Sequence, residues 1–201
     1  MTGQPWLWLI AGPNGAGKST YASNIAADVE DIVRPDELAY RISREVTQAV
    51  ALQAGRIAVR RRTELLRQRR SFAVETTLSG RGYLQVVERA RSEDWNVGII
   101  YIGLGSPELA IERVRERVSQ GGHDVPASDV RRRYERSLEN LAVVYGLADR
   151  LLVLDNSSVA KRMKRVLEVN CGNVVFRQRR LPKWLSAALR ATIRGGPTKA
   201  D

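Results

Sequence analysis

The segment LIAGPNGAGKSTYA, residues 9–22, decides the fold of this chain of 201 residues. Within it, residues 12–19 match the pattern of a glycine, any four residues, then Gly-Lys and Ser or Thr. The pattern follows the apolar run WLWLIA and precedes a stretch that can be helical. An order of strand, loop and helix with this spacing is typical of a loop whose backbone N–H groups surround phosphate at a helix N-terminus.

The residue types of this loop suit a nucleoside triphosphate with magnesium, and we expect ATP or GTP and Mg²⁺ as cofactors. Three glycines let the backbone adopt positive φ and approach oxygen atoms without a Cβ in the way. Lys18 is expected to reach the β- and γ-phosphates, and the Ser19 hydroxyl to bind the metal. A glycine-rich turn that binds nothing is the alternative, which the full spacing disfavours. The predicted nucleotide-binding residues are Gly12, Pro13, Asn14, Gly15, Ala16, Gly17, Lys18, Ser19 and Thr20.

Length and composition are those of one globular domain. The chain is 43% hydrophobic, and it has no apolar run of about 18 residues, the length that a transmembrane helix needs. The N-terminal MTGQPWLWLIAG lacks the basic region of a signal peptide. A single cysteine, Cys171, cannot form an internal disulfide, so a reducing compartment is expected. We therefore expect a cytoplasmic protein that does not contact a membrane.

The net charge of +11 is concentrated toward the C-terminus. Residues 160–201 contain eleven Lys or Arg against two acidic residues, Glu168 and Asp201. Such a tail could attract nucleic acid, an acidic partner protein or an anionic surface. A solvated basic tail without a ligand explains the same composition equally well.

Alternating strands and helices predict an α/β domain of the P-loop NTPase fold, doubly wound around a mostly parallel five-stranded sheet. The strands are mostly continuous apolar runs, which indicate a parallel sheet covered on both faces. We expect strands at residues 6–11, 31–36, 71–77, 96–104 and 150–156, and helices at 18–28, 37–69, 82–93, 106–119 and 127–146.

The predicted core comprises residues 1–157, with a helical lid at about 106–146. After residue 157 the pattern changes. RVLEVNCGNVVFR predicts a hairpin that turns at NCGN, and PKWLSAALR predicts a short helix. We assign residues 158–201, including the basic tail, to an extension of the same domain.

Polar residues follow the second and third predicted strands, where ligands bind in such sheets. RPDELA places Asp36 at the end of the second strand, and VETTLSG places Glu75, Thr76 and Thr77 at the end of the third. Asp36 could accept the proton of an attacking hydroxyl. Alternatively, it could cap the N-terminus of the following helix. We expect Glu75 and the two threonines to contact the acceptor of the phosphate.

Two carboxylates compete for the metal. LLVLD, which ends at Asp155, resembles the apolar run and aspartate that hold magnesium in many P-loop enzymes. In the strand order 2-3-1-4-5, usual for small kinases of this fold, the third strand lies beside the first and the fifth is distal. We therefore expect Ser19 and Glu75 to form the metal site. Asp155 and Asn156 are expected near the nucleotide base or in a turn.

The segment from residue 106 to 146 predicts a lid. Arg113 and Arg117 are spaced i, i+4 and share a helix face. GGHDVP breaks that helix, and the next one is expected to be capped by Ser128 or Asp129. Arginine-bearing helices joined by a glycine hinge can close over phosphates. His123 in the hinge is expected to make a lid contact rather than to act as a base. The alternative is surface pairing of the arginines with Glu108, Glu112, Glu116 and Glu135.

The order of these motifs resembles the zeta-toxin family of P-loop kinases, in its stand-alone branch, over about residues 6–186. The motifs are GPNGAGKST, RPDELA, FAVETTLSG, RVSQGGHDVP with RRRYERSLENL, and LPKWL. The resemblance implies transfer of the γ-phosphate of ATP or GTP to a nucleotide sugar, typically the 3′-hydroxyl of UDP-N-acetylglucosamine. It also implies a toxin that could have an antitoxin protein as its partner.

The resemblance also implies roles for individual residues. It makes Lys18 and Ser19 the phosphate and metal residues, and Asp36 the general base. Glu75 and Thr77 fall in the acceptor-binding region. Arg117 and one of the arginines at positions 131–133, of which we take Arg132, correspond to catalytic lid arginines.

Two other functional classes remain open. A polynucleotide or RNA kinase would explain the positive charge, although no run of aromatic residues interleaved with basic ones is present to stack bases. A nucleotide-regulated binding module would need the phosphate loop alone. Asp36 disfavours that class, because a binding module that transfers no phosphate needs no general base at this strand end.

Overall fold

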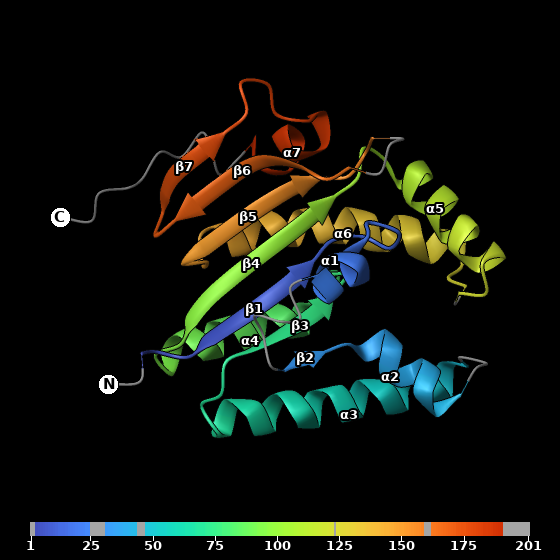
Figure 1. Cartoon of the computed structure of the whole chain (residues 1–201), viewed down its shortest axis with the longest axis horizontal. Helices are drawn as coiled ribbons and strands as arrows, with labels where there is room; N and C mark the ends of the chain where they lie inside the picture. Colours follow the sequence, from blue (N-terminus) through green and yellow to red (C-terminus); the bar gives the residue numbers. More distant parts are fainter. Residues whose placement is uncertain (1–2, 25–30, 44–46, 123, 159–161, 191–201) are drawn as a thin grey trace.

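The computed structural model describes residues 3–24, 31–43, 47–122, 124–158 and 162–190 (Figure 1). Expectations for residues 25–28, for His123 and for the basic tail from residue 191 lie outside these ranges. The strands are β1 (Trp6–Ala11), β2 (Ile32–Val33), β3 (Phe72–Thr76), β4 (Asn96–Gly103), β5 (Arg150–Asp155), β6 (Lys164–Asn170) and β7 (Asn173–Arg177). The helices are α1 (Lys18–Asn24), α2 (Pro35–Ile42), α3 (Gln48–Arg67), α4 (Arg81–Ser92), α5 (Pro107–Ser119), α6 (Ala127–Tyr145) and α7 (Lys183–Ala188).

The strands form one sheet in the order β2-β3-β1-β4-β5-β6-β7. The first five pair in parallel in the order expected for this fold. The prediction of a five-stranded sheet is wrong in its strand number, because β6 and β7 extend the same sheet to seven. They do so because the chain after β5 returns as a hairpin, and β6 pairs antiparallel with β5.

The hairpin turns at Cys171 and Gly172, within the predicted NCGN segment. Both residues have positive φ, 46° and 76°, as a two-residue type I′ turn requires. The backbone N–H of Cys171 donates to the carbonyl of Asp149, 2.7 Å away, which ties the turn to the start of β5. The extension is therefore hydrogen-bonded to the core sheet.

The predicted helix at 37–69 is two helices, α2 and α3, and the strand before it is shorter than expected. Pro35 occupies the first turn of α2, where the fixed φ of proline favours a helix start, so β2 ends at Val33. A second start follows at Thr47, whose hydroxyl accepts a hydrogen bond from the N–H of Val50 at 3.3 Å.

The predicted lid helices are present as α5 and α6. Helix α5 ends in a Schellman motif, in which Gly121 has a φ of +85°. In this motif the N–H of Gly122 donates to the carbonyl of Arg117 at 2.9 Å. The expected cap of α6 by Ser128 or Asp129 is wrong, because the N-cap is Pro126 without a side-chain hydrogen bond.

The helices cover the two faces of the sheet unequally. Helices α4 and α6 lie behind the sheet in Figure 1, and the largest hydrophobic cluster joins α3, α4, α6 and α7 to this back face. In front of the central strands, α1 is the one helix of the described ranges, and it packs near their carboxyl ends. No helix within these ranges is long and apolar enough to cross a membrane.

Trp184 joins the C-terminal extension to the core. Its side chain is 6% exposed, and its ring fills the space where a Cβ on Gly103 would stand. Its Nε1 donates to Asp155 Oδ1 at 3.1 Å. The extension and the P-loop core therefore share one hydrophobic cluster.

We expect Trp184→Ala to lower the free energy of unfolding by about 3–5 kcal/mol, because a large buried ring is removed. Chemical denaturation followed by circular dichroism would measure this change in the free energy of unfolding. We expect a single unfolding transition if the extension belongs to the same domain as the core. Lys183→Ala, an exposed neighbour on α7, is the matched control and should change stability by less than about 0.5 kcal/mol. Two separate transitions, with Trp184→Ala affecting one of them, would contradict a single domain.

Candidate functional site

The phosphate loop has the backbone that its glycines predict. Gly12, Gly15 and Gly17 have φ values of +141°, +73° and +89°. A Cβ on Gly12 would collide with the carbonyl oxygen of Ile102, and one on Gly15 would stand 2.9 Å from that of Ala110. Glycine is therefore required here both by conformation and by the close approach of β4 and α5.

The loop is held in place by buried polar side chains. Lys18, 7% exposed, donates from Nζ to the carbonyl of Pro13 at 2.9 Å. Asn156 Nδ2 donates to the carbonyl of Ala16 at 3.0 Å, and Asn14 is 3% exposed. An ammonium group has three N–H donors, so two donors of Lys18 remain for phosphate oxygens. The glycine cradle and this lysine fit a nucleoside triphosphate.

Charges of both signs surround Lys18. Burial lowers the pKa of its ammonium, and the nearby Arg117 and Arg133 act in the same direction. Glu75 and Asp36 oppose this change, because their carboxylates favour the charged form. These five residues, which lie far apart in the sequence, therefore form one electrostatic cluster.

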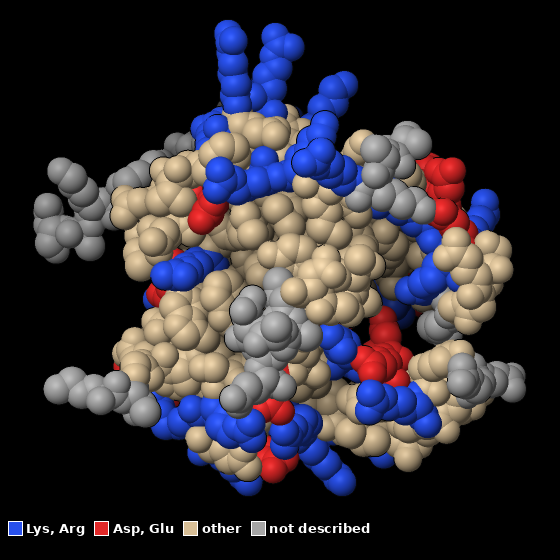
Figure 2. All heavy atoms as spheres, viewed as in Figure 1, with Lys and Arg blue, Asp and Glu red and all other residues tan. Residues whose placement is uncertain are grey.

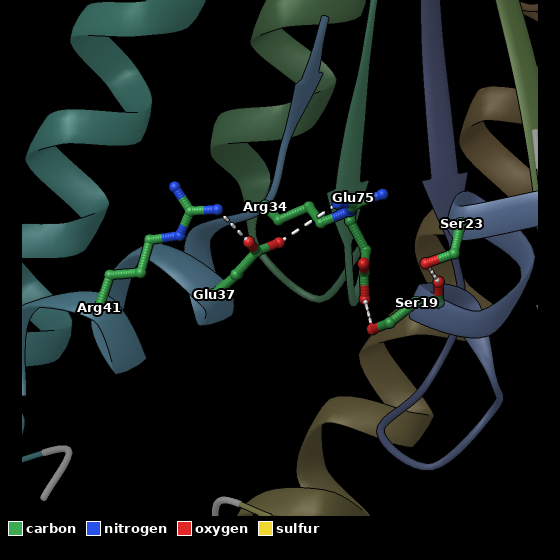
Figure 3. A network of polar contacts seen from close by, with 6 residues as sticks. All are labelled: Ser19, Ser23, Arg34, Glu37, Arg41 and Glu75. Carbon is green, nitrogen blue, oxygen red and sulfur yellow. Dashed lines mark hydrogen bonds and ion pairs between the residues drawn. The ribbon is translucent and has the colours of Figure 1, made fainter. Parts of the chain in front are cut away.

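Ser19 and Glu75 lie together as the strand order predicted. Glu75 extends from the end of β3 toward the start of α1, where its Oε1 accepts a hydrogen bond from Ser19 Oγ at 2.8 Å (Figure 3). The ranges that the structure covers hold no group of three His, Cys, Asp or Glu suited to a metal. Mg²⁺ typically takes one or two protein oxygens together with waters and phosphates, so Ser19 and Glu75 fit it.

Asp155 is engaged elsewhere. Its Oδ1 accepts hydrogen bonds from the hydroxyl and the backbone N–H of Ser157, and from Trp184 Nε1. The carboxylate therefore joins a turn to α7, while the neighbouring Asn156 holds the phosphate loop. Asp155 and Asn156 were expected either near the nucleotide base or in a turn, and the contacts of Asp155 match the turn.

Two cavities meet above the carboxyl ends of the strands. One, of about 370 Å³, lies along the phosphate loop and is also lined by Arg113 and Met163. The other, of about 550 Å³, is enclosed by α2, the end of β3, the start of α4, the end of α5, and α6. Figure 2 shows a hollow beside α5 on this side of the molecule. The residues that line both cavities are Lys18, Ser19, Asp36, Glu75, Arg117 and Gln120.

Asp36 and Glu37 differ in their surroundings, although they are neighbours on α2. Arg34 and Arg41 bind Glu37 at 3.2 and 2.6 Å (Figure 3). Burial works against ionisation of Glu37, but the hydrogen bonds from Arg41 and Arg34 prevail and lower its pKa. Asp36 has no hydrogen bond or ion pair within the described parts of the chain. The N-cap of α2 is Arg34, and Asp36 lies inside the helix, after Pro35. The cap interpretation of Asp36 is therefore wrong.

Thr76 and Thr77 both line the larger cavity. Thr76 Oγ1 accepts a hydrogen bond from the N–H of Leu78 at 2.9 Å, in the turn after β3. Thr77 Oγ1 lies 2.8 Å from Ser79 Oγ. Thr77 is the less buried of the two threonines, so it is the more accessible from the cavity.

Sequence reasoning missed Tyr83, which lines the larger cavity from the first turn of α4. Burial raises the pKa of its phenol, and the negative charges of Asp36 and Glu75 act in the same direction. The guanidinium of Arg62 lies over its ring, 5.5 Å from the centroid. The sequence signal that could have identified Tyr83 is an aromatic residue with a hydroxyl in the first helical turn after VETTLSG.

The arginines of the lid separate into two groups. Arg117 lines both cavities, and Arg133 lines the larger one. Arg132, which we expected to be catalytic, is exposed and pairs with Asp129 at 2.7 Å, so the structure does not bring it into either cavity. Successive helical residues point about 100° apart, which is why Arg133 and not Arg132 faces the cavity.

The two remaining expectations for the lid concern Arg113 and the surface pairing of arginines with glutamates. Arg113 lines the cavity of the phosphate loop and donates to the carbonyl of Ser158 at 3.2 Å. Surface pairing, the alternative considered for these arginines, applies to Arg131, which binds Glu108 at 3.1 Å.

Solved structures share this fold. An AvrRxo1-ORF1:-ORF2 structure with ATP matches with a TM-score of 0.72 at 15% identity, over 98% of this chain and 66% of that one. A structure of the PezAT chromosomal toxin-antitoxin system of Streptococcus pneumoniae matches with a TM-score of 0.61 at 13% identity, over 96% of this chain and 85% of that one. The chain spans 60–66% of the length of the AvrRxo1 chains that it matches.

Sequence comparison gives the family. A protein of Haemophilus influenzae, described only as uncharacterized, is 32% identical over 135 residues, which are 64% of this chain and 96% of that protein. The model of the zeta toxin family matches residues 1–179. The phosphate loop, both cavities and the cluster around Lys18 lie within that match, and the chain belongs to the zeta toxin family.

Proposed function

We propose that this protein is a kinase that transfers the γ-phosphate of ATP or GTP to a hydroxyl of a nucleotide sugar, such as UDP-N-acetylglucosamine. The observation that carries the proposal is the junction of the two cavities. A donor bound along the phosphate loop and an acceptor bound between α2 and α4 would meet there. Lys18, Asp36 and Arg117 line that junction.

The residues at the junction have the roles that phosphoryl transfer requires. Bound ATP with Mg²⁺, for which Ser19 and Glu75 offer oxygen ligands, supplies the phosphoryl group. Asp36 takes the proton of the acceptor hydroxyl while the oxygen of that hydroxyl forms a bond to the γ-phosphorus. The bond between this phosphorus and the oxygen that bridges the β- and γ-phosphates breaks, and ADP leaves. Lys18, Arg117 and Arg133 stabilise the charge on the transferring group.

The size and lining of the larger cavity favour a small acceptor. A volume of about 550 Å³ is in the usual range for small-molecule sites. Its lining combines the apolar bodies of Tyr40 and Tyr83 with the polar Thr77 and three arginines, which are Arg34, Arg117 and Arg133. A molecule with a base, a diphosphate and a sugar presents matching surfaces.

Membership of the zeta toxin family supports a role as the toxin of a toxin-antitoxin pair, acting in the cytoplasm. The matching AvrRxo1-ORF1:-ORF2 and PezAT structures, as their names state, concern a two-component complex and a toxin-antitoxin system. We therefore propose an antitoxin protein as a partner.

The direct test is incubation of the purified protein with γ-labelled ATP or GTP and a panel of nucleotide sugars, nucleosides and RNA 5′ ends. We expect label on a nucleotide sugar, and Lys18→Ala should reduce transfer by at least about 100-fold, because its charge lies at the transferring phosphate. Lys164→Ala, which changes an exposed lysine on β6, is the control and should retain full activity. Label on RNA ends alone would replace the small-molecule proposal with a polynucleotide kinase.

Asp36→Asn should reduce kcat by about two to four orders of magnitude, because the amide cannot accept the acceptor's proton. Stability should change by less than about 0.5 kcal/mol, since Asp36 does not cap α2. Glu37→Gln is the matched variant: it weakens two ion pairs beside the cavity and should raise KM for the acceptor more than it lowers kcat. Equal kcat for Asp36→Asn and wild type would exclude Asp36 as the base.

Arg133→Ala should lower kcat by at least about 10-fold, because it removes a charge from the cavity wall. Arg132→Ala removes the same side chain from the adjacent, solvent-facing position and should leave kcat within about two-fold of wild type. Steady-state kinetics of the pair give the comparison. The reverse order of effects would restore Arg132 as the lid arginine.

A further inference from the structure

The front face of the sheet carries a surface that the proposed kinase site does not use. Strand register places Trp6 and Trp8 of β1 on the same face as Gly98 of β4 and Arg150 of β5, through the pairs Trp8↔Gly98 and Gly98↔Arg150. The pairs Leu152↔Glu168 and Glu168↔Phe176 carry the same face onto β6 and β7. Because paired residues of neighbouring strands point to one side, these side chains form a continuous surface.

Aromatic rings and guanidinium groups alternate along this surface. Trp6 and Trp8 stack with centroids 5.1 Å apart and an interplanar angle of 16°. Arg150 lies over the ring of Trp6, 5.1 Å from its centroid, and Arg165 lies over Phe176 at 3.9 Å. We call these five residues the aromatic platform.

The ring of Trp8 lies against the sheet. A Cβ on Gly98 would overlap three atoms of the Trp8 ring, so this ring covers β4 where the strand has no side chain. Trp6, Trp8 and Phe176 are all partly exposed. Arg150 lies over Trp6 and Arg165 over Phe176, so a base would stack on these guanidinium planes or take their place over the rings.

The charge around the platform is positive. Among the described front-face residues of β1 and β4–β7, Glu168 is the one acidic side chain, and Arg165 binds it at 2.9 Å. Figure 2 shows Lys and Arg along the upper rim of this face. Exposed basic residues of β6, β7 and the segment leading into α7 are Lys164, Arg165, Arg177, Arg179 and Arg180. The register places Arg165 on the front face, and Lys164 and Arg177 on the opposite face at this edge of the sheet.

We propose that the aromatic platform binds single-stranded nucleic acid. Bases would stack over Trp6 and Phe176 where Arg150 and Arg165 now lie, and the displaced guanidinium groups and the basic rim would contact phosphates. An acidic polypeptide would satisfy the charges, but it brings no flat π-systems to match the rings. A duplex keeps its bases stacked inside, so its phosphates alone would reach the surface.

The platform is separate from the phosphoryl-transfer site. Trp6 and Arg150 begin their strands, whereas the cavities lie beyond the opposite, carboxyl ends. None of the five platform residues lines either cavity. Binding at the platform should therefore neither require ATP nor depend on Lys18.

The test is fluorescence anisotropy of end-labelled 20-nucleotide oligo(U) and oligo(dT), measured in low salt with the full-length protein. We expect binding that weakens with salt and is unchanged in Lys18→Ala. Each stacked base contributes about 1–3 kcal/mol, so Phe176→Ala should weaken binding by about 5- to 160-fold. Arg150→Glu should weaken it by at least 10-fold, and the charge-matched Arg56→Glu on exposed α3 by much less.

Tryptophan fluorescence gives an independent readout. Trp95 and Trp184 are 4% and 6% exposed, so quenching on oligonucleotide binding would report stacking on Trp6 and Trp8. Heparin and polyglutamate, which have charge without bases, should bind less tightly and leave the fluorescence unquenched. Equal binding of these polyanions without quenching would overturn the proposal in favour of a general acidic partner.

Two further outcomes would overturn the proposal. Equal effects of Arg150→Glu and Arg56→Glu would show that net charge alone drives binding. Loss of binding in Lys18→Ala, or on addition of ATP, would place the nucleic acid in the kinase site. Phosphoryl transfer measured on the same Phe176→Ala and Arg150→Glu proteins should stay at the wild-type level, which confirms their folding and separates this proposal from the kinase proposal.

Discussion

Parallel pairing of β1 with β3 is the constraint on which the rest of the site depends. The register Ile10↔Glu75 and Ala11↔Thr76 brings the end of β3 beside the strand that leads into the phosphate loop. Parallel neighbours end at the same edge of a sheet, so Ser19 at the start of α1 meets the Glu75 carboxylate. With β2 on the other side of β3, Asp36 enters the same cavity.

Opposing electrostatic effects act on Lys18 in this arrangement. Burial in the loop disfavours an ammonium ion, and two arginines from the lid helices add to that effect. The carboxylates from β3 and α2 act in the opposite direction, because they favour the charged form of the lysine. The same carboxylates are the groups that we propose for metal binding and for proton abstraction, which links the stability of the loop to its chemistry.

The hairpin after β5 has two consequences for the molecule. It extends the sheet with an antiparallel pair and returns the chain to the back face, where Trp184 binds the Asp155 carboxylate. That carboxylate stands at the end of LLVLD, yet it serves as an anchor for α7. The hairpin also places no helix over the front of β4 to β7 within the described ranges, which leaves the aromatic platform partly exposed.

The sequence by itself determined the phosphate loop, the order of the first five strands and the meeting of Ser19 with Glu75, because these follow from local spacing and from the rules of parallel sheets. It could not determine the seven-stranded sheet, because the local pattern predicts the β6–β7 hairpin but not whether β6 pairs with the edge strand β5. Nor could it select Arg133 over Arg132, since that depends on how α6 is rotated against α5. The aromatic platform is likewise a product of strand register, since strand pairing joins residues of β1, β5, β6 and β7 that stand far apart in the chain.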